Sequence, residues 1–277
     1  MAISKPTRAA PVPALHQPSV SFKVKWRSER VVHVIVAPLT LVAIIVAWEL
    51  VVQIRDYPSF ILPSPGDVWA ELLQSIQAPS FWGHMGVTLI EVAGGLLVGA
   101  SLAMAMGYIV AKSQILSSIL SPLIVGSQAI PIVAIAPLLA IWFGYGLTPK
   151  IVTSTLIVFF PVLINVAAGI RSVEPNLRDL MRSLQANRRQ MFAMLEVPTA
   201  LPMLLSGLKV GATLSVIGAV VGEFVNSDKG LGFLVKQGNG EYNTARTFVA
   251  LIALMTIALM LYGAVTLIER RALAWRR

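Results

Sequence analysis

Long apolar runs dominate this sequence and leave few folds open to it. Six runs have the length of about 20 residues that crosses a bilayer as a helix, at about 32–54, 84–111, 119–143, 149–170, 201–224 and 247–268. In lipid, a helix satisfies its own backbone hydrogen bonds. The chain is 56% hydrophobic, and its charged share of 13% is about half the usual one. We therefore expect an all-α, polytopic membrane protein with six transmembrane helices.

The distribution of basic residues predicts how these helices are oriented. Six spans place both termini on the same side of the membrane. The segments on that side hold sixteen Lys and Arg residues, and the segments on the other side hold five. The positive-inside rule then predicts that both termini are cytoplasmic. The net charge of +9 thus reflects orientation, and we expect no nucleic-acid partner.

We expect one membrane domain, residues 32–270, between two cytoplasmic tails. Residues 1–31 hold prolines, small residues and basic residues, a composition typical of disorder. Residues 271–277 form the second tail. On the outer side, the segment from Ser64 to Asp67 offers an N-cap serine followed by proline and an acid, which predicts a short helix. A polar loop rich in glycine is expected before the last span.

One polar stretch, residues 176–198, interrupts the apolar runs between the fourth and fifth spans. Its apolar residues keep a helical spacing: Leu177, Leu180, Met181 and Leu184, then Met191, Phe192 and Leu195. The pattern predicts an amphipathic helix that breaks near residues 185–187. Orientation places this stretch in the cytoplasm. Its apolar stripe needs either a partner protein or the lipid interface.

The third span carries three prolines, Pro122, Pro131 and Pro137. Each interior proline removes a backbone hydrogen bond, and in lipid the freed carbonyl needs another partner or water. The prolines therefore favour a helix that lines a path, with simple kinking as the alternative. Gln128 is the best polar candidate on this helix. Glycines in the second span predict close packing against a neighbouring helix.

Four ionisable residues lie within the spans: Glu49, Glu91, Lys209 and Glu223. Such residues are functional candidates by default. The three acids lie toward the predicted outer ends, where they either form a polar network at an outer mouth or face the interface. Lys209 lies toward the inner end, where its stem can extend to the interface.

No catalytic pattern is present. The sequence has no Gly-Lys-Ser/Thr phosphate-binding loop, no cysteine and only scattered histidines. We therefore expect no enzymatic activity, no cofactor and no metal site in this chain.

Residues 179–198 resemble the cytoplasmic loop of permease subunits of ATP-binding-cassette importers. That loop reads Glu-Ala-Ala, three residues, Gly, nine residues, Ile, one residue, Leu-Pro. In this chain Asp179-Leu180-Met181 takes the Glu-Ala-Ala place, and Gln185 stands where Gly is expected. The end of the pattern is matched by Leu195, Val197 and Pro198.

Further segments resemble one branch of this family, the permeases for nitrate, sulfonates, taurine, hydroxymethylpyrimidine and riboflavin. These segments are Leu62–Pro65, Thr88–Glu91, Ile130–Gly146, Ser206–Val210 and Val216–Phe224 followed by Lys229–Phe233. The last pair is most similar to the pyrimidine- and riboflavin-type members.

The resemblance implies a membrane-spanning permease subunit of an ATP-driven importer in the bacterial cytoplasmic (inner) membrane. Two permease subunits, expected as a homodimer, would form the solute path. Two copies of a separate ATPase subunit would each bind one cytoplasmic loop, and an extracytoplasmic solute-binding protein would deliver the solute. A hydroxymethylpyrimidine- or riboflavin-like nutrient is expected. The alternatives are a nitrate-, sulfonate- or taurine-type solute, or a self-sufficient secondary transporter.

The resemblance also implies which residues carry the function. The coupling loop is residues 171–200, and its attachment residues would be Leu177, Asp179, Leu180, Met181, Arg182, Leu184, Gln185, Arg188 and Pro198. The candidates for the translocation path are Gln128, Pro131, Pro137, Glu91 and Glu223. If the family's glycine makes a left-handed turn, Gln185 costs about 1–2 kcal/mol there, unless Asn187 takes over the turn.

Overall fold

The computed structural model describes residues 26–225 and 227–276, and these contain helices and no strand. The chain divides into two compact units, residues 1–48 and 49–277. Helix α1 (Trp26–Arg55) supplies the described part of the first unit and ends in the second. Of the tail expected at residues 1–31, residues 1–25 lie outside the described part, and residues 26–31 belong to α1.

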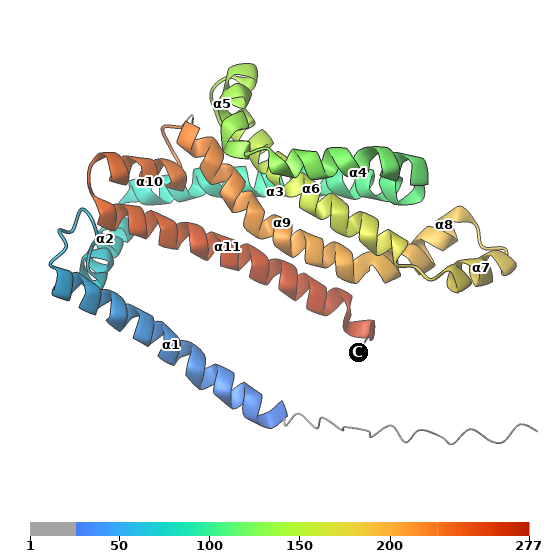
Figure 1. The fold of residues 1–277 in the computed structure, drawn as a ribbon, viewed down its shortest axis with the longest axis horizontal. Helices are drawn as coiled ribbons and strands as arrows, with labels where there is room; N and C mark the ends of the chain where they lie inside the picture. The colour runs from blue at the N-terminus through green and yellow to red at the C-terminus, as the bar shows by residue number, and fades with distance from the viewer. Residues whose placement is uncertain (1–25, 226, 277) are drawn as a thin grey trace, which may run out of the picture. The chain divides into compact units, whose positions relative to one another are not determined.

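The second unit contains the other long helices, which are α3 (Pro79–Lys112), α6 (Leu147–Arg171), α9 (Val197–Val225) and α11 (Thr244–Ala272). With α1, they supply five helical stretches long and apolar enough to cross a membrane. Helices α4 (Gln114–Ala129) and α5 (Ile132–Phe143) form a sixth candidate span, bent by 95° between them (Figure 1). The prediction of an all-α polytopic membrane protein is confirmed.

The third predicted span is therefore not a continuous helix. The break falls at Pro131, which has no N–H to donate and which precedes α5 as its N-cap. Ile130 before it is extended, with φ −82° and ψ 121°, as the residue before a proline prefers. Pro122 and Pro137 lie inside α4 and α5 without interrupting them. Only one of the three prolines separates the two halves.

Two short helices lie on the side predicted to be outside. Helix α2 (Pro65–Gln77) begins as expected, because Ser64 Oγ accepts from the Asp67 N–H at 3.1 Å and Asp67 accepts from the Ser64 N–H at 3.0 Å. The prediction of a loop before the last span is wrong, because residues 231–240 form helix α10 (Leu231–Gly240). Leu231 and Val235 are buried there, so this glycine-rich segment has an apolar face that packs as a helix.

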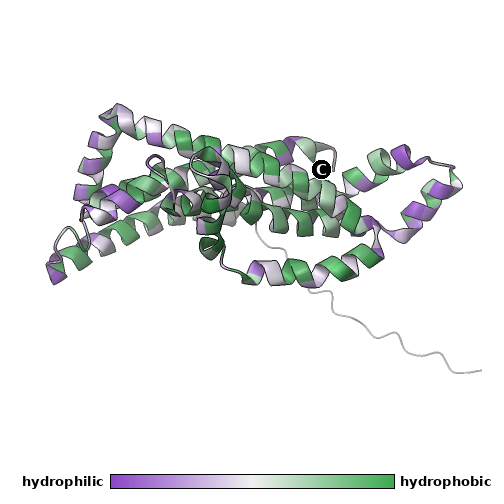
Figure 2. Cartoon of the chain, turned by 90° about the horizontal axis from the view of Figure 1, so that it is seen from above, coloured by the Kyte–Doolittle hydropathy of each residue, from purple (hydrophilic) through white to green (hydrophobic). Residues whose placement is uncertain are grey.

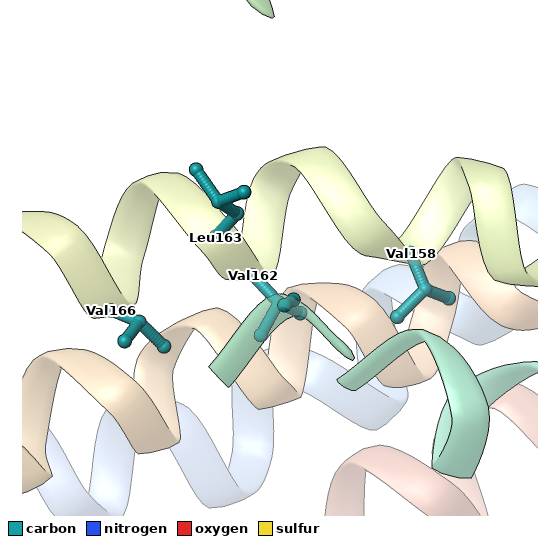
Figure 3. Packing of buried hydrophobic residues seen from close by; sticks show 5 residues of the cluster. Val158, Val162, Leu163 and Val166 are labelled. Carbon is teal, nitrogen blue, oxygen red and sulfur yellow. The ribbon is translucent and has the colours of Figure 1, made fainter. Parts of the chain in front are cut away.

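The core of the second unit is α6 packed against α3 and α9. Glycines make the contacts close: Cβ atoms added at Gly95 or Gly218 would overlap Ser154 of α6. The close packing expected of the second span is thus confirmed. Along α6, residues Val158, Val162 and Val166 recur every fourth position and form the apolar core with Leu163 and Ala103 (Figure 3). In lipid, such close contact between helix backbones is a main source of association.

The glycine contact generates a stability prediction. Gly218→Ala places a methyl group against the Cα of Ser154, which cannot move aside as a flexible side chain could. We expect a loss of about 1–3 kcal/mol in the free energy of unfolding, measured by thermal or denaturant unfolding in detergent. Gly263→Ala is the matched control, because no heavy atom lies within 4 Å of its added Cβ. Equal stability of the two variants would contradict this account of the packing.

Candidate functional site

The coupling loop folds into three short helical pieces between α6 and α9. They are α7 (Pro175–Ser183), α8 (Arg188–Gln190) and a π-helical stretch (Met191–Glu196) that runs into α9. In Figure 1, α7 and α8 lie at one end of the long helices of this unit, with α2 and α10 at the other. Figure 2 shows hydrophilic residues at both ends of the long helices, α7 and α8 among them, whereas the long helices are mainly hydrophobic in between. The predicted helix break near residues 185–187 is confirmed.

Gln185 makes the left-handed turn itself. Its φ is 56°, and the turn is closed by the Ala186 N–H, which donates to the Met181 carbonyl at 3.0 Å. Asn187 has a φ of −73° and caps α8 instead, exchanging hydrogen bonds of 2.9 and 2.8 Å with Gln190. The alternative in which Asn187 takes over the turn is therefore wrong.

The apolar stripe of α7 is exposed. Leu177, Leu180 and Leu184 are 41%, 55% and 69% accessible, and Met181 beside them is half-buried. On another face of α7, Asp179 and Arg182 pair with each other at 3.1 Å, and both side chains are exposed. Of the remaining attachment residues, Arg188 is exposed at the start of α8 and Pro198 is half-buried in the first turn of α9. The predicted attachment residues thus share one end of the unit.

Two anchors fasten this loop to the long helices. The Arg178 guanidinium donates to the Ile170 carbonyl near the end of α6 at 2.9 Å. The Glu196 side chain is buried and pairs with Lys112 at the end of α3, while the Tyr108 hydroxyl donates to it at 3.2 Å. Sequence reasoning missed both anchors. For the Glu196 anchor, the sequence shows only an acidic residue at the start of an apolar run, with no indication of its partner.

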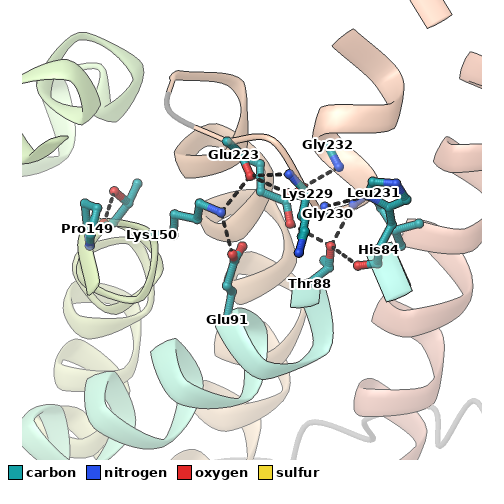
Figure 4. Close-up of polar contacts among 12 residues, drawn as sticks. His84, Thr88, Glu91, Pro149, Lys150, Glu223, Lys229, Gly230, Leu231 and Gly232 are labelled. Carbon is teal, nitrogen blue, oxygen red and sulfur yellow. Dashed lines mark hydrogen bonds and ion pairs between the residues drawn. The ribbon is translucent and has the colours of Figure 1, made fainter. Parts of the chain in front are cut away.

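A buried polar network occupies the opposite end of the same helices. Glu91 of α3 is fully buried, and Lys150 Nζ of α6 lies 2.9 Å from its Oε1 (Figure 4). Lys150 also donates to Ser227 Oγ at 2.7 Å. Glu223 of α9 is equally buried and accepts a hydrogen bond of 2.6 Å from the Thr88 hydroxyl. Glu91 and Glu223 therefore belong to a buried polar network, and exposure at the interface is wrong for both.

The same network caps the start of α10. The first N–H groups of a helix have no partner within the helix, so other groups must accept from them. Here the Gly230 N–H donates to His84 Nδ1 at 3.0 Å, the Leu231 N–H to Thr88 Oγ1 at 2.8 Å, and the Gly232 N–H to the Glu223 carboxylate. Gly230 has a φ of 114°, which favours glycine. Three side chains from α3 and α9 thus hold α10 in place.

The sequence contains a local signal for part of this network. His84, Thr88 and Glu91 follow at spacings of four and three, which places them on one face of a helix. Lys150 is one of the five basic residues assigned to the outer segments, and no local pattern pairs it with Glu91. Glu49, by contrast, lies outside the network and accepts from the Gln53 amide at 2.6 Å. Lys209 pairs with Glu269 of α11.

A groove of about 400 Å³ opens at the break between α4 and α5. Gln128 and Pro131 line it, together with Phe160 and Pro161 of α6. Pro137 is exposed in α5 and does not line this groove. The path candidates therefore fall in different places: two at the groove, two in the buried network, and Pro137 in neither.

Comparison with known proteins identifies the chain's family. The family of the binding-protein-dependent transport system inner membrane component matches residues 95–273. The chain belongs to this family. It is thus a permease subunit of an ABC importer and a multi-pass inner-membrane protein.

Individual relatives differ in the solute that their names give. The permease is 41% identical over 238 residues to the riboflavin transport system permease protein RibX of Chloroflexus aurantiacus, covering 86% of this chain and 89% of the relative. It is 30% identical over 261 residues to the taurine transport system permease protein TauC of Escherichia coli, covering 92% and 94%. Its fold matches a chain of the inward-facing MetNI methionine ABC transporter with a TM-score of 0.56 at 20% identity, covering 70% and 94%.

The turn at Gln185 yields one prediction. Gln185→Gly removes the left-handed strain of about 1–2 kcal/mol but adds the greater freedom of glycine, about 0.5–1 kcal/mol, in the unfolded chain. We expect unchanged or slightly higher stability in denaturant unfolding, and unchanged transport-coupled ATP hydrolysis. Gln190→Gly, which removes the side chain of the α8 cap, should lower stability. A loss of coupled hydrolysis in Gln185→Gly would reveal a specific role for the glutamine side chain.

The buried Glu91–Lys150 ion pair yields a second prediction. Lys150→Met removes the cation that pairs with buried Glu91, and we expect a loss of about 3–5 kcal/mol in the free energy of unfolding. The double variant with Glu91→Leu removes both charges and should lose less than the single variant. Unfolding midpoints of the two single variants and the double variant test this. Additive losses would show that the pair makes no energetic contribution as a unit.

Proposed function

We propose that two copies of this permease form the path for a small, neutral heteroaromatic nutrient of the riboflavin or hydroxymethylpyrimidine type. A separate ATPase subunit binds each coupling loop and hydrolyses ATP, so the permease itself has no catalytic role. A solute-binding protein delivers the nutrient at the outer face. Both termini and the coupling loop are cytoplasmic in this arrangement.

The exposed stripe of α7 is the observation that carries the coupling role. Leu180 and Leu184 form an exposed apolar face together with Leu177, which also borders the start of α9. Burying such a side chain fully in a cleft of the ATPase stabilises the complex by about 1.5–3 kcal/mol. The exposed Asp179–Arg182 pair at the rim contributes about 0–1 kcal/mol. The stripe is therefore the main attachment, and an interfacial helix lying on lipid is the alternative use of the same face.

The two anchors support a mechanical role for the loop. Arg178 ties it to the end of α6, and Glu196 ties it to the end of α3. A displacement of α7 by the ATPase therefore acts on two helices of the core at once. At their other ends those helices carry Lys150 and Thr88, which belong to the network that holds α10. Movement at the loop can thus reach the outer end without a flexible link.

The identity of the solute rests mainly on the relatives. Identity to the riboflavin permease is 41%, against 30% to the taurine permease. Glu91 and Glu223 give no information about the solute, because both are buried inside the protein. A taurine-like solute is the second candidate, supported by the match over 92% of the chain.

If the ATPase binds the apolar stripe of α7, one negative charge placed in that stripe should weaken binding. Leu180→Asp puts a carboxylate where the ATPase cleft would be apolar, so affinity for the ATPase subunit should fall at least about tenfold. Co-purification of the ATPase with tagged permease from membranes measures this. The permease itself should remain in the membrane at normal abundance.

Ser183→Asp is the matched control. It adds the same charge to α7 at an exposed position off the stripe. This variant should retain the ATPase. If Leu180→Asp also retains the ATPase, the stripe is not the docking surface, and α7 lying on lipid becomes the better account.

A further inference from the structure

The groove beside the broken helix has the dimensions and lining of a ligand site. Its volume of about 400 Å³ lies in the range of small-molecule sites, roughly 300–1,000 Å³. Most of its lining is apolar, with isoleucines from both sides of the break and Phe160 of α6. Two side chains, Ser127 and Gln128, supply polar atoms.

The position of the groove also distinguishes it from an ordinary surface hollow. The α6 residues that line it, Leu156, Ile157, Phe160 and Pro161, surround the middle of a helix that runs from Leu147 to Arg171. Facing them is the break between α4 and α5, where the two halves turn by 95° (Figure 1). Transporters commonly bind solutes near the bilayer midplane at discontinuous helices, where irregular backbone lines a cavity.

The polar groups at the groove match one class of ligand. Gln128 is exposed and offers both an amide donor and a carbonyl acceptor. Pro161 has no N–H, so the Ile157 carbonyl lacks the donor that a helix normally supplies four residues later. Phe160 offers an aromatic ring, and ring pairs contribute beyond their buried area. A flat ring with neighbouring N–H and carbonyl groups could use all three.

The absence of charged side chains in the groove argues against anionic solutes. Among the described residues that line the groove, none is charged. Binding an anion such as a sulfonate or nitrate away from water needs a cation or several N–H donors, because an uncompensated buried charge is costly. A neutral solute has no such requirement.

We propose that this groove is the binding site of the transported solute within the membrane, and that it selects neutral, planar heteroaromatic compounds. Phe160 stacks on the ring, while Gln128 and the Ile157 carbonyl hydrogen-bond its N–H and carbonyl edge. This inference rests on the proposed import function and adds the residues that recognise the solute.

The natural absence of cysteine makes a direct test possible. Gln128→Cys places one thiol in the groove, and Val210→Cys places one on α9, where the side chain is 44% accessible near the middle of that helix. Each variant is assembled with its ATPase and solute-binding protein in vesicles, and its labelling by N-ethylmaleimide is followed with and without riboflavin. Riboflavin at about ten times its dissociation constant should slow labelling of Gln128→Cys about tenfold and leave Val210→Cys unaffected.

A second variant tests the aromatic contact. In the Gln128→Cys background, Phe160→Leu should raise the riboflavin concentration needed for protection about three- to tenfold. Phe143→Leu makes the same substitution at the end of α5, outside the groove, and should have no effect.

The outcomes separate this inference from the function on which it rests. If Gln128→Cys vesicles still import riboflavin but riboflavin does not protect the thiol, the groove is not the solute site. If taurine protects the thiol and riboflavin does not, the neutral heteroaromatic selectivity is wrong. If wild-type vesicles import neither riboflavin nor a hydroxymethylpyrimidine, the proposed substrate class fails first, and the recognition proposed for the groove fails with it.

Discussion

The close packing of α6 against α3 and α9 is the contact on which the rest of this structure depends. Small residues bring the backbones together, so Gly95 and Gly218 approach Ser154 from two sides. Lipid provides no hydrophobic drive for helices to associate, and tight van der Waals contact takes its place. The same three helices carry the coupling-loop anchors at one end and the buried network at the other. A change at either end therefore acts on one packed unit.

The polar residues inside this unit explain what the packing is for. Burying Glu91, Lys150 or Glu223 would be costly without partners. Glu91 and Lys150 lie beside each other with opposite charges, and Glu223 accepts a hydrogen bond from Thr88. These contacts fix α10 and the loop before it against α3. At the opposite end of these helices, Glu196 and Lys112 do the same for the coupling loop. Rigid attachment at both ends suits a subunit that transmits force, and α4 and α5 provide the irregular element beside it.

Local patterns in the sequence predicted a large part of this architecture. The lengths of the apolar runs predicted the membrane-spanning helices, except that the third run forms two helices. Ser64 and Asp67 predicted the start of α2, and the spacing of the leucines predicted α7 and the break after it. The failures have physical reasons. Proline composition alone does not decide which of Pro122, Pro131 and Pro137 interrupts a helix. The Glu196–Lys112 and Thr88–Glu223 contacts join residues 84 and 135 positions apart, beyond the reach of any local pattern.

The central claim is that this permease moves solute only when an ATPase drives its coupling loop. The most direct measurement is riboflavin uptake into vesicles that contain the permease, with the ATPase subunit, ATP and solute-binding protein added or omitted one at a time. The account predicts uptake only in the complete mixture. Uptake by the permease alone, down a solute or proton gradient, would contradict it and would indicate a self-sufficient transporter.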